Sequence, residues 1–255
     1  MSGVHAHALY VHGHSPVHRL PPECKIAAQI VFVFAVVATP REAFWAFAID
    51  AAIVAGVIAL AGLRPGFVLR RLVVELPFVA FALFLPLVGR GERVDVFGSS
   101  LSVEGLWGTW NILAKATLGV ATAIVVAATT TMPEFLRGFD RLHAPRALTS
   151  IASFMIRYAD VISDEVRRMR VARESRGFGG RWIWHARAVA ASAGTLFIRS
   201  YERGERVYLA MVSRGYPGAM PDITSQDATS RDWLAASLFP AAAAVVAVTA
   251  WALVR

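Results

Sequence analysis

Two segments of the sequence, FMIRYADVISDEVRRMRVARESRGF (residues 154–178) and LFIRSYERGERVYLAMVSRGY (residues 196–216), end in the same way. The first closes on Ser175-Arg176-Gly177 and the second on Ser213-Arg214-Gly215, and an aromatic residue follows each glycine. A glycine just past a helix end adopts a left-handed backbone conformation that residues with side chains rarely take. The pattern therefore predicts two helices, each with an arginine at its last turn.

We expect these helices over residues 151–176 and 186–214. At ~1.5 Å rise per residue they would be about 39 Å and 43 Å long. Each segment also contains an aliphatic-arginine step near its start, Ile156-Arg157 in the first and Ile198-Arg199 in the second. The region from 133 to 218 is basic and not a membrane span, so we expect two long rods outside the bilayer.

The remainder of the chain reads as an all-α, polytopic membrane protein. Hydrophobic residues make up 56% of the 255 residues and the mean hydropathy is positive, which is typical of bilayer proteins. We expect Pro77 and Pro86 to kink the third span, and the polar residues 89–105 to form a loop. About five spans are predicted, over residues 21–39, 43–63, 67–88, 106–131 and 233–254.

Charge asymmetry predicts the orientation. Residues 64–71 contain three arginines, and residues 133–231 contain sixteen arginines and ten acidic residues. Residues 89–105, in contrast, contain two arginines and three acidic residues. Basic loops stay in the cytoplasm, so we expect the N-terminus and both long helices inside and the C-terminus outside. The chain then divides into a His-rich cytoplasmic N-terminal segment (1–24), four membrane helices (25–132), the cytoplasmic helical region (133–218), and a linker with the last span (219–255).

The net charge of +8 does not require a nucleic-acid partner, because the positive-inside rule already accounts for the clustered arginines. The single cysteine, Cys24, excludes an intramolecular disulfide and a cysteine-based metal cage. The polar, His-rich N-terminus lacks the basic-then-apolar pattern of a cleaved signal peptide.

Three ionisable residues, Asp50, Glu75 and Lys115, fall within apolar spans, where a charge is costly. From their depths we expect Asp50 and Lys115 to pair across the second and fourth spans, and Glu75 to reach the inner interface or Arg71. The alternatives are that Lys115 snorkels outward alone while Asp50 meets a partner chain or water, or that the three residues line a proton or ion path.

Five histidines precede the first span. His5, His7, His12 and His14 form two His-x-His pairs, a spacing that suits a divalent transition metal when imidazole is neutral. No carboxylate or cysteine completes a cage, so a surface tail without bound metal is the alternative.

Catalytic signatures are missing from the sequence. There is no Gly-x-x-x-x-Gly-Lys-Ser/Thr loop to hold a triphosphate, and no His-Glu-x-x-His metalloprotease motif. We therefore expect a chain that is not an enzyme, carries no cofactor and does not hydrolyse ATP itself.

These features together resemble the transmembrane T component of energy-coupling factor (ECF) transporters, in particular the cobalt-type member CbiQ. Residues 15–25, SPVHRLPPECK, are similar to the family's opening Pro-Leu-His-x-Leu-Asp-Pro-x-x-Lys, with Pro21 where the family has Asp. Residues 135–165 resemble its first cytoplasmic helix, through Phe135-Leu136-Arg137-Gly138-Phe139, Leu142, Pro145, Arg157-Tyr158 and Glu165. The two Ser-Arg-Gly tripeptides fall on its paired Ala-Arg-Gly signatures.

The resemblance implies two cytosolic ABC-type ATPase subunits, each receiving one coupling-helix tip, with Arg176 and Arg214 contacting acidic or carbonyl groups. It also implies a separate membrane subunit that captures the substrate, cobalt, and a multi-pass location in the bilayer of the bacterial inner membrane. A nickel or vitamin importer of the same class stays open, as does a stand-alone ion channel or membrane enzyme.

Overall fold

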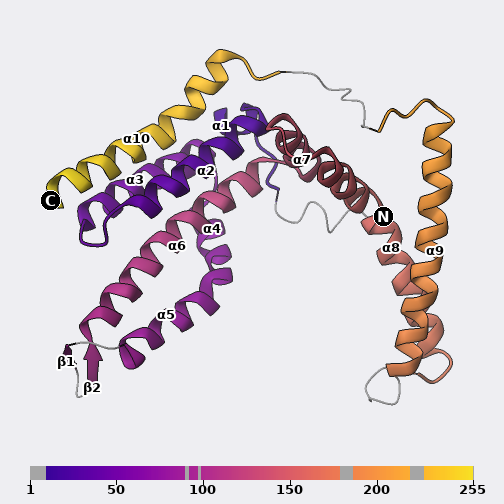
Figure 1. The fold of residues 1–255 in the computed structure, drawn as a ribbon, viewed down its shortest axis with the longest axis horizontal. Helices are drawn as coiled ribbons and strands as arrows, with labels where there is room; N and C mark the ends of the chain where they lie inside the picture. Colours follow the sequence, from indigo (N-terminus) through magenta and orange to yellow (C-terminus); the bar gives the residue numbers. More distant parts are fainter. Residues whose placement is uncertain (1–9, 90–91, 97–98, 179–185, 219–226, 255) are drawn as a thin grey trace. The chain divides into compact units, whose positions relative to one another are not determined.

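Helices form nearly all of the chain in the computed structural model, which describes residues 10–89, 92–96, 99–178, 186–218 and 227–254 (Figure 1). Two compact units are present. One contains the long helices α8 (Arg146–Glu174) and α9 (Ala186–Val212), and the other contains the described residues of Leu9–Leu142 and Gln226–Arg255. The predicted all-α class is confirmed.

Three helical stretches of the second unit are long and apolar enough to cross a bilayer: Pro65–Val88, α6 (Val103–Thr129) and Ser230–Leu253 of α10 (Ser230–Val254). Two further apolar helices of 17 residues each, α2 (Pro22–Ala38) and α3 (Phe44–Leu60), pack beside them. The chain is therefore a polytopic membrane protein.

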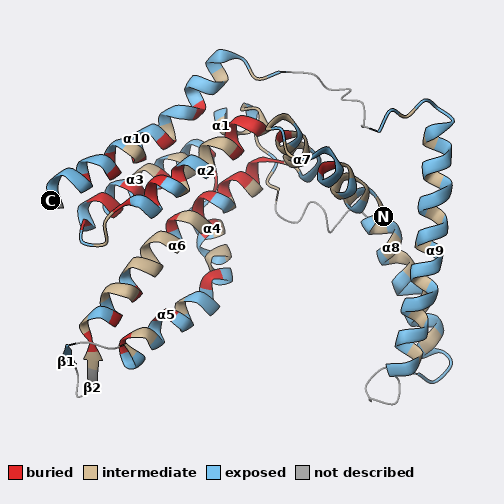
Figure 2. Ribbon diagram, in the orientation of Figure 1, coloured by how far each residue is buried: buried red, intermediate tan, exposed pale blue. Residues whose placement is uncertain are grey.

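Helices α2, α3, α6 and α10 share one apolar core. Phe32 of α2 stacks on Phe239 of α10 with ring centroids 4.3 Å apart. Figure 2 shows buried stretches along α2, α3 and α6. Large apolar side chains such as Phe34, which is 70% exposed, remain on the surface. Such exposure is expected of a surface solvated by lipid. The buried core residues are Phe32, Ala35, Val36, Phe47, Val54, Leu118, Ala121 and Ala243.

The third predicted span is a composite of α4 (Pro65–Arg71), a 3-10 turn, η1 (Leu72–Glu75), and α5 (Leu76–Val88). Pro77 lies in the first turn of α5, where its missing N–H costs least, and the tighter 3-10 turn comes directly before it. The expected irregularity at this proline is present. Pro86 lies inside α5.

The segment from 89 to 105 is not simply a loop, as the sequence pattern suggested. Strands β1 (Arg93–Val96) and β2 (Ser99–Ser102) pair antiparallel, with Arg93 opposite Ser102 and Val96 opposite Ser99. Only two residues separate the strands, and Ser102 then accepts a hydrogen bond from the Gly105 N–H to begin α6. The short apolar-polar alternation of residues 93–96 was the available signal.

Polar contacts hold the N-terminal segment against the start of α2 and the end of α6. The Lys25 ammonium donates to the carbonyl of Thr129 at 2.9 Å and to the hydroxyl of Thr130 at 3.2 Å. His18, at the end of α1 (Pro16–Arg19), bonds through Nε2 to the Val11 carbonyl. These contacts give the histidine and the lysine of the opening motif a structural role in this chain.

Helix α7 (Met132–Arg141) packs on α2 in the same unit. Arg141 pairs with Glu23 at 2.9 Å, and the Glu23 side chain is only 5% exposed. Gly138 allows this approach, because a Cβ there would lie 2.7 Å from Ile26 Cδ1 and 3.0 Å from the Pro22 carbonyl carbon. A capping box between Thr131 and Glu134 fixes the start of α7.

The expected Asp50–Lys115 pair is not formed. Lys115 Nζ donates instead to the Val37 carbonyl at 2.8 Å. That carbonyl belongs to the last turn of α2, where carbonyl groups lack helical partners and carry partial negative charge. Glu75 accepts a hydrogen bond from Thr117 at 3.0 Å. Asp50 is fully buried, and neither of its carboxyl oxygens bonds to any residue that the structure describes.

Candidate functional site

The long helices α8 and α9 run antiparallel, as their shared surfaces show. Residues 165–173 of α8, with Arg176 and Phe178 of the turn that follows, face residues 188–199 of α9. Residues 154–162 of α8 face residues 200–211 of α9. The predicted helices are confirmed, although α8 begins five residues earlier than expected and both end two residues earlier. At ~1.5 Å per residue they are about 44 Å and 40 Å long.

The C-terminal turn of α8 has the predicted left-handed glycine. Gly177 has a φ of +82°. The Gly177 N–H donates to the Glu174 carbonyl, and the Phe178 N–H donates to the Arg173 carbonyl. The Ser175 hydroxyl also donates to a carbonyl, that of Ala172, at 3.0 Å. The bond from Phe178 spans the turn in the manner of a Schellman motif.

The C-terminal turn of α9 repeats this arrangement atom for atom. Gly215 has a φ of +81°, and its N–H donates to the Val212 carbonyl. The Tyr216 N–H donates to the Met211 carbonyl, and the Ser213 hydroxyl donates to the Ala210 carbonyl at 3.0 Å. The sequence echo is therefore a structural repeat.

Each repeat presents one exposed arginine, Arg176 on the first turn and Arg214 on the second. Among the residues that the structure describes, neither guanidinium forms an ion pair. Because the helices are antiparallel, the two tips lie at opposite ends of the hairpin. Helix α9 has 27 residues, so at a rise of ~1.5 Å per residue the tips are about 40 Å apart. One small docking surface cannot hold both.

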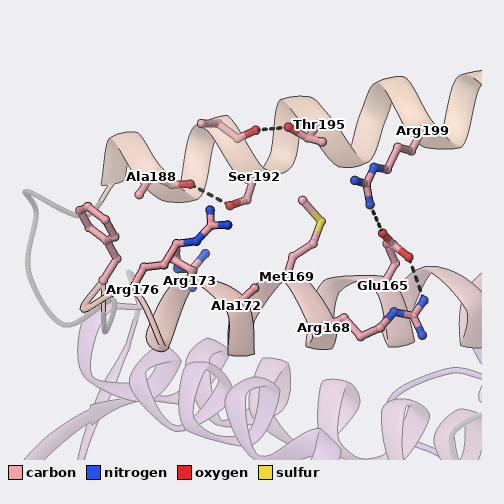
Figure 3. A pocket seen from close by; sticks show the side chains of 12 residues that line it. Glu165, Arg168, Met169, Ala172, Arg173, Arg176, Ala188, Ser192, Thr195 and Arg199 are labelled. Atoms are coloured by element: carbon pink, nitrogen blue, oxygen red, sulfur yellow. Dashed lines mark hydrogen bonds and ion pairs between the residues drawn. The ribbon is translucent and has the colours of Figure 1, made fainter.

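A groove of about 560 Å³ separates α8 from α9 near the first tip (Figure 3). Glu165 of α8 accepts hydrogen bonds from Arg168 of α8, at 2.8 Å, and from Arg199 of α9. Arg173 and Arg176 extend from α8 toward α9 in the same view. The Glu165–Arg199 ion pair thus joins the two rods through a residue of each.

The bonds from Arg168 and then Arg199 hold the pKa of Glu165 below its ordinary value of 4.5. A depressed carboxyl pKa contributes stability above the ordinary value, and this stability is lost as pH falls through the folded-state pKa. We expect Glu165→Gln to lower the thermal stability of the hairpin at neutral pH, with the difference from wild type shrinking below about pH 4.5. Thermal unfolding followed by circular dichroism over a pH series measures this.

Glu205→Gln is the matched control, because Glu205 is an exposed acid of α9 without an ion pair to a described residue. It should show no such pH dependence. An equal loss for Glu165→Gln at acid and neutral pH would contradict the assignment.

The candidate metal histidines are only partly described. His12 and His14 are exposed, and the ring of His12 contacts that of Tyr10 with centroids 4.9 Å apart. His5 and His7 lie outside the described residues. Within the described ranges no three His, Cys, Asp or Glu side chains gather as a metal site would require.

Residues 13–225 match the family of CbiQ cobalt transport proteins. The chain belongs to this family. It is also similar to proteins named energy-coupling factor transporter transmembrane protein EcfT. The protein from Thermosediminibacter oceani is 26% identical, and the match covers 82% of this chain and 83% of that protein. The protein from Thermanaerovibrio acidaminovorans is 29% identical, and the match covers 83% of this chain and 82% of that protein. A putative fused cobalt transport protein CbiMQ from Methanocorpusculum labreanum is 26% identical over 54% of this chain and 24% of its own length.

The resemblance inferred from the Ser-Arg-Gly tripeptides and the opening motif is thereby confirmed. This CbiQ-family protein is a membrane subunit of a transporter and not an enzyme.

Proposed function

We propose that this CbiQ-family protein is the coupling subunit of an ECF-type importer. In this role it passes the motion of two ABC-type ATPase subunits to a membrane subunit that captures the substrate. The repeated, arginine-bearing turns at the ends of α8 and α9 carry the proposal. Their backbone hydrogen bonds match, and the glycine φ angles are +82° and +81°, so both turns present a serine and an arginine in the same backbone geometry, as two equivalent partners would require.

An arginine on a rigid turn is suited to docking. Its planar guanidinium offers several N–H donors to a carboxylate or to backbone carbonyls, and it stays charged at all physiological pH values. Arg176 and Arg214 are exposed at points about 40 Å apart, which favours one ATPase for each tip.

Force applied at one tip would be shared by both rods, because the Glu165–Arg199 pair joins α8 to α9. Helix α8 follows α7 after four residues, among which His143 has a left-handed φ of +62°. Helix α7 is in turn fixed to α2 through Arg141, Glu23 and the close approach at Gly138. The covalent chain therefore links the tips to the membrane helices through α7.

Cobalt is the proposed cargo, because the matched family consists of cobalt transport proteins. Nickel and vitamins are the alternatives. The cargo site would lie in the capture subunit, so α8 and α9 need no metal ligands. We place the protein in the bacterial inner membrane with its N-terminus in the cytoplasm, on the arginine content of residues 133–231.

Purification of the tagged, full-length chain from its native membrane tests the proposal. We expect mass spectrometry to identify two ATPase subunits and a small membrane protein with it, and the complex to take up radioactive Co²⁺ in an ATP-dependent way. Cation flux through the chain alone, without any ATPase in the preparation, would contradict the proposal.

A further inference from the structure

A cavity of about 490 Å³ lies among α2, α3, α6 and α10, within the membrane unit. The arginine tips and the coupling helices have no part in it. Its wall is built mostly from aliphatic side chains of the four helices and the N-terminal segment. Representative lining residues are Leu20, Ala28, Val57, Val125, Leu238 and Phe239.

Helices α3 and α10 approach each other closely beside the cavity. Ala46 of α3 packs with Val246 and Ala250 of α10, so small residues let the two backbones approach there. Toward the other end the wall includes Leu60 of α3 and Leu238 of α10, which are 62% and 73% exposed. The cavity therefore opens sideways between α3 and α10, on a surface that faces lipid.

Polar groups in the wall are few. The Lys25 ammonium is already bonded to the Thr129 carbonyl, and the Thr122 hydroxyl lies 2.8 Å from the Gly119 carbonyl, to which it donates. Gln29 differs, because its amide lines the cavity without a hydrogen bond to any residue that the structure describes. An unbonded amide in an apolar membrane environment is costly, so an occupant that offers an acceptor is favoured.

Three arginines lie close in sequence to residues that line this cavity. Arg19 precedes the lining residue Leu20, and Arg231 lies one helical turn before Ala235 on the same side of α10. Arg64, the N-cap residue of α4, follows Leu60 by four residues. All three arginines are exposed and none forms an ion pair with a described residue. Basic clusters beside a pocket between membrane helices suit anionic lipid head groups.

We propose that this cavity is a binding site for one anionic phospholipid. An acyl chain enters between α3 and α10 and fills the aliphatic space. The phosphate lies at the end marked by Arg19, Arg64 and Arg231, and the Gln29 amide donates to a carbonyl oxygen of the lipid. The occupied site would bridge α3 and α10 between the exposed Leu60 and Leu238.

Gly56 provides a sharp test, because it lines the cavity and a Cβ there would meet nothing within 4 Å. Gly56→Leu should fill part of the space without a clash, and it should favour the helix. Gly194→Leu is the matched control. Gly194 is also a helical glycine with nothing within 4 Å of an added Cβ, but it lies on α9.

The full-length chain, with the subunits that accompany it, would be stripped of lipid and titrated with phosphatidylglycerol or phosphatidylcholine under native mass spectrometry. We expect wild type and Gly194→Leu to retain one phosphatidylglycerol and Gly56→Leu to retain none, with thermal stability no lower than wild type. Replacing Arg19, Arg64 and Arg231 by glutamine should reduce the preference for phosphatidylglycerol by about fivefold for each arginine.

Equal retention of phosphatidylglycerol by wild type and Gly56→Leu would overturn the proposal, and is the result expected if an apolar segment of a partner fills the cavity. An unchanged lipid preference in the glutamine variant would also overturn it. None of these results depends on the ATPases binding at the helix tips, so this proposal and the coupling function can fail separately.

Discussion

Charge reversal at both helix tips, Arg176→Glu with Arg214→Glu, is expected to remove the ATPase subunits from the purified complex and to reduce Co²⁺ uptake to background. Loss of one partner of a buried, hydrogen-bonded charge pair typically costs about 2–5 kcal/mol, which is about thirtyfold or more in affinity for each tip. Reversal adds repulsion against acidic groups of the partner. Mass spectrometry of the purified complex and an uptake assay in vesicles measure the two effects.

Arg167→Glu with Arg206→Glu is the control for this variant. These arginines are exposed on α8 and α9, and the double change alters the net charge by the same amount. Within the described part of the chain, they form ion pairs only with Asp164 and Glu202, one turn away on the same helices. The control should keep its ATPases. Equal loss in both variants would mean that overall charge, not the tips, holds the complex together.

Gly105→Ala should destabilise the membrane unit, because an added Cβ meets closer atoms here than at any other glycine that the structure describes. An added Cβ would lie 2.5 Å from the Leu85 carbonyl oxygen and 2.6 Å from the Pro86 Cα, both backbone atoms that cannot rotate away. Helices α5 and α6 would have to separate, which would also strain the hydrogen bond from Thr109 to the Ala82 carbonyl at 2.7 Å. We expect a loss of about 3 kcal/mol or more, measured by thermal or denaturant unfolding in detergent.

Gly108→Ala, one turn from Gly105, is the matched control for this effect. Its Cβ would meet only Leu85 Cδ1 at 3.8 Å, an ordinary contact. A helical alanine is favoured over glycine by about 1 kcal/mol, so the control should be neutral or slightly stabilising. Similar behaviour of the two variants would show that α5 and α6 do not approach as closely as the structure indicates.

Local features of this protein could be predicted from the sequence. The two helix tips depend on residues within one or two turns, so the glycine after each arginine was enough to indicate both the helix end and its left-handed φ. The membrane helices were visible for a similar reason, because each span is a continuous apolar run whose limits need no knowledge of its neighbours.

Contacts between distant residues could not be predicted in this way. Glu23 and Arg141 are 118 residues apart, and Glu165 and Arg199 belong to different helices, so no local pattern marks either pair. The Asp50–Lys115 pairing failed because depth in the bilayer does not fix the rotation of a helix about its axis. The free carbonyl of Val37 also offered Lys115 a nearer acceptor.

Site-directed cross-linking at the tips tests the coupling role most directly. Cys24, the single native cysteine, is buried, so Ser175→Cys or Ser213→Cys would supply an exposed thiol beside each arginine. A short thiol-to-amine reagent should join each cysteine to an ATPase subunit in native membranes, whereas Tyr201→Cys, exposed in the middle of α9, should give no such product. Cross-links from both tips would support coupling through two ATPases. If the complex still contains the ATPases but neither tip gives a cross-link, the coupling role is contradicted.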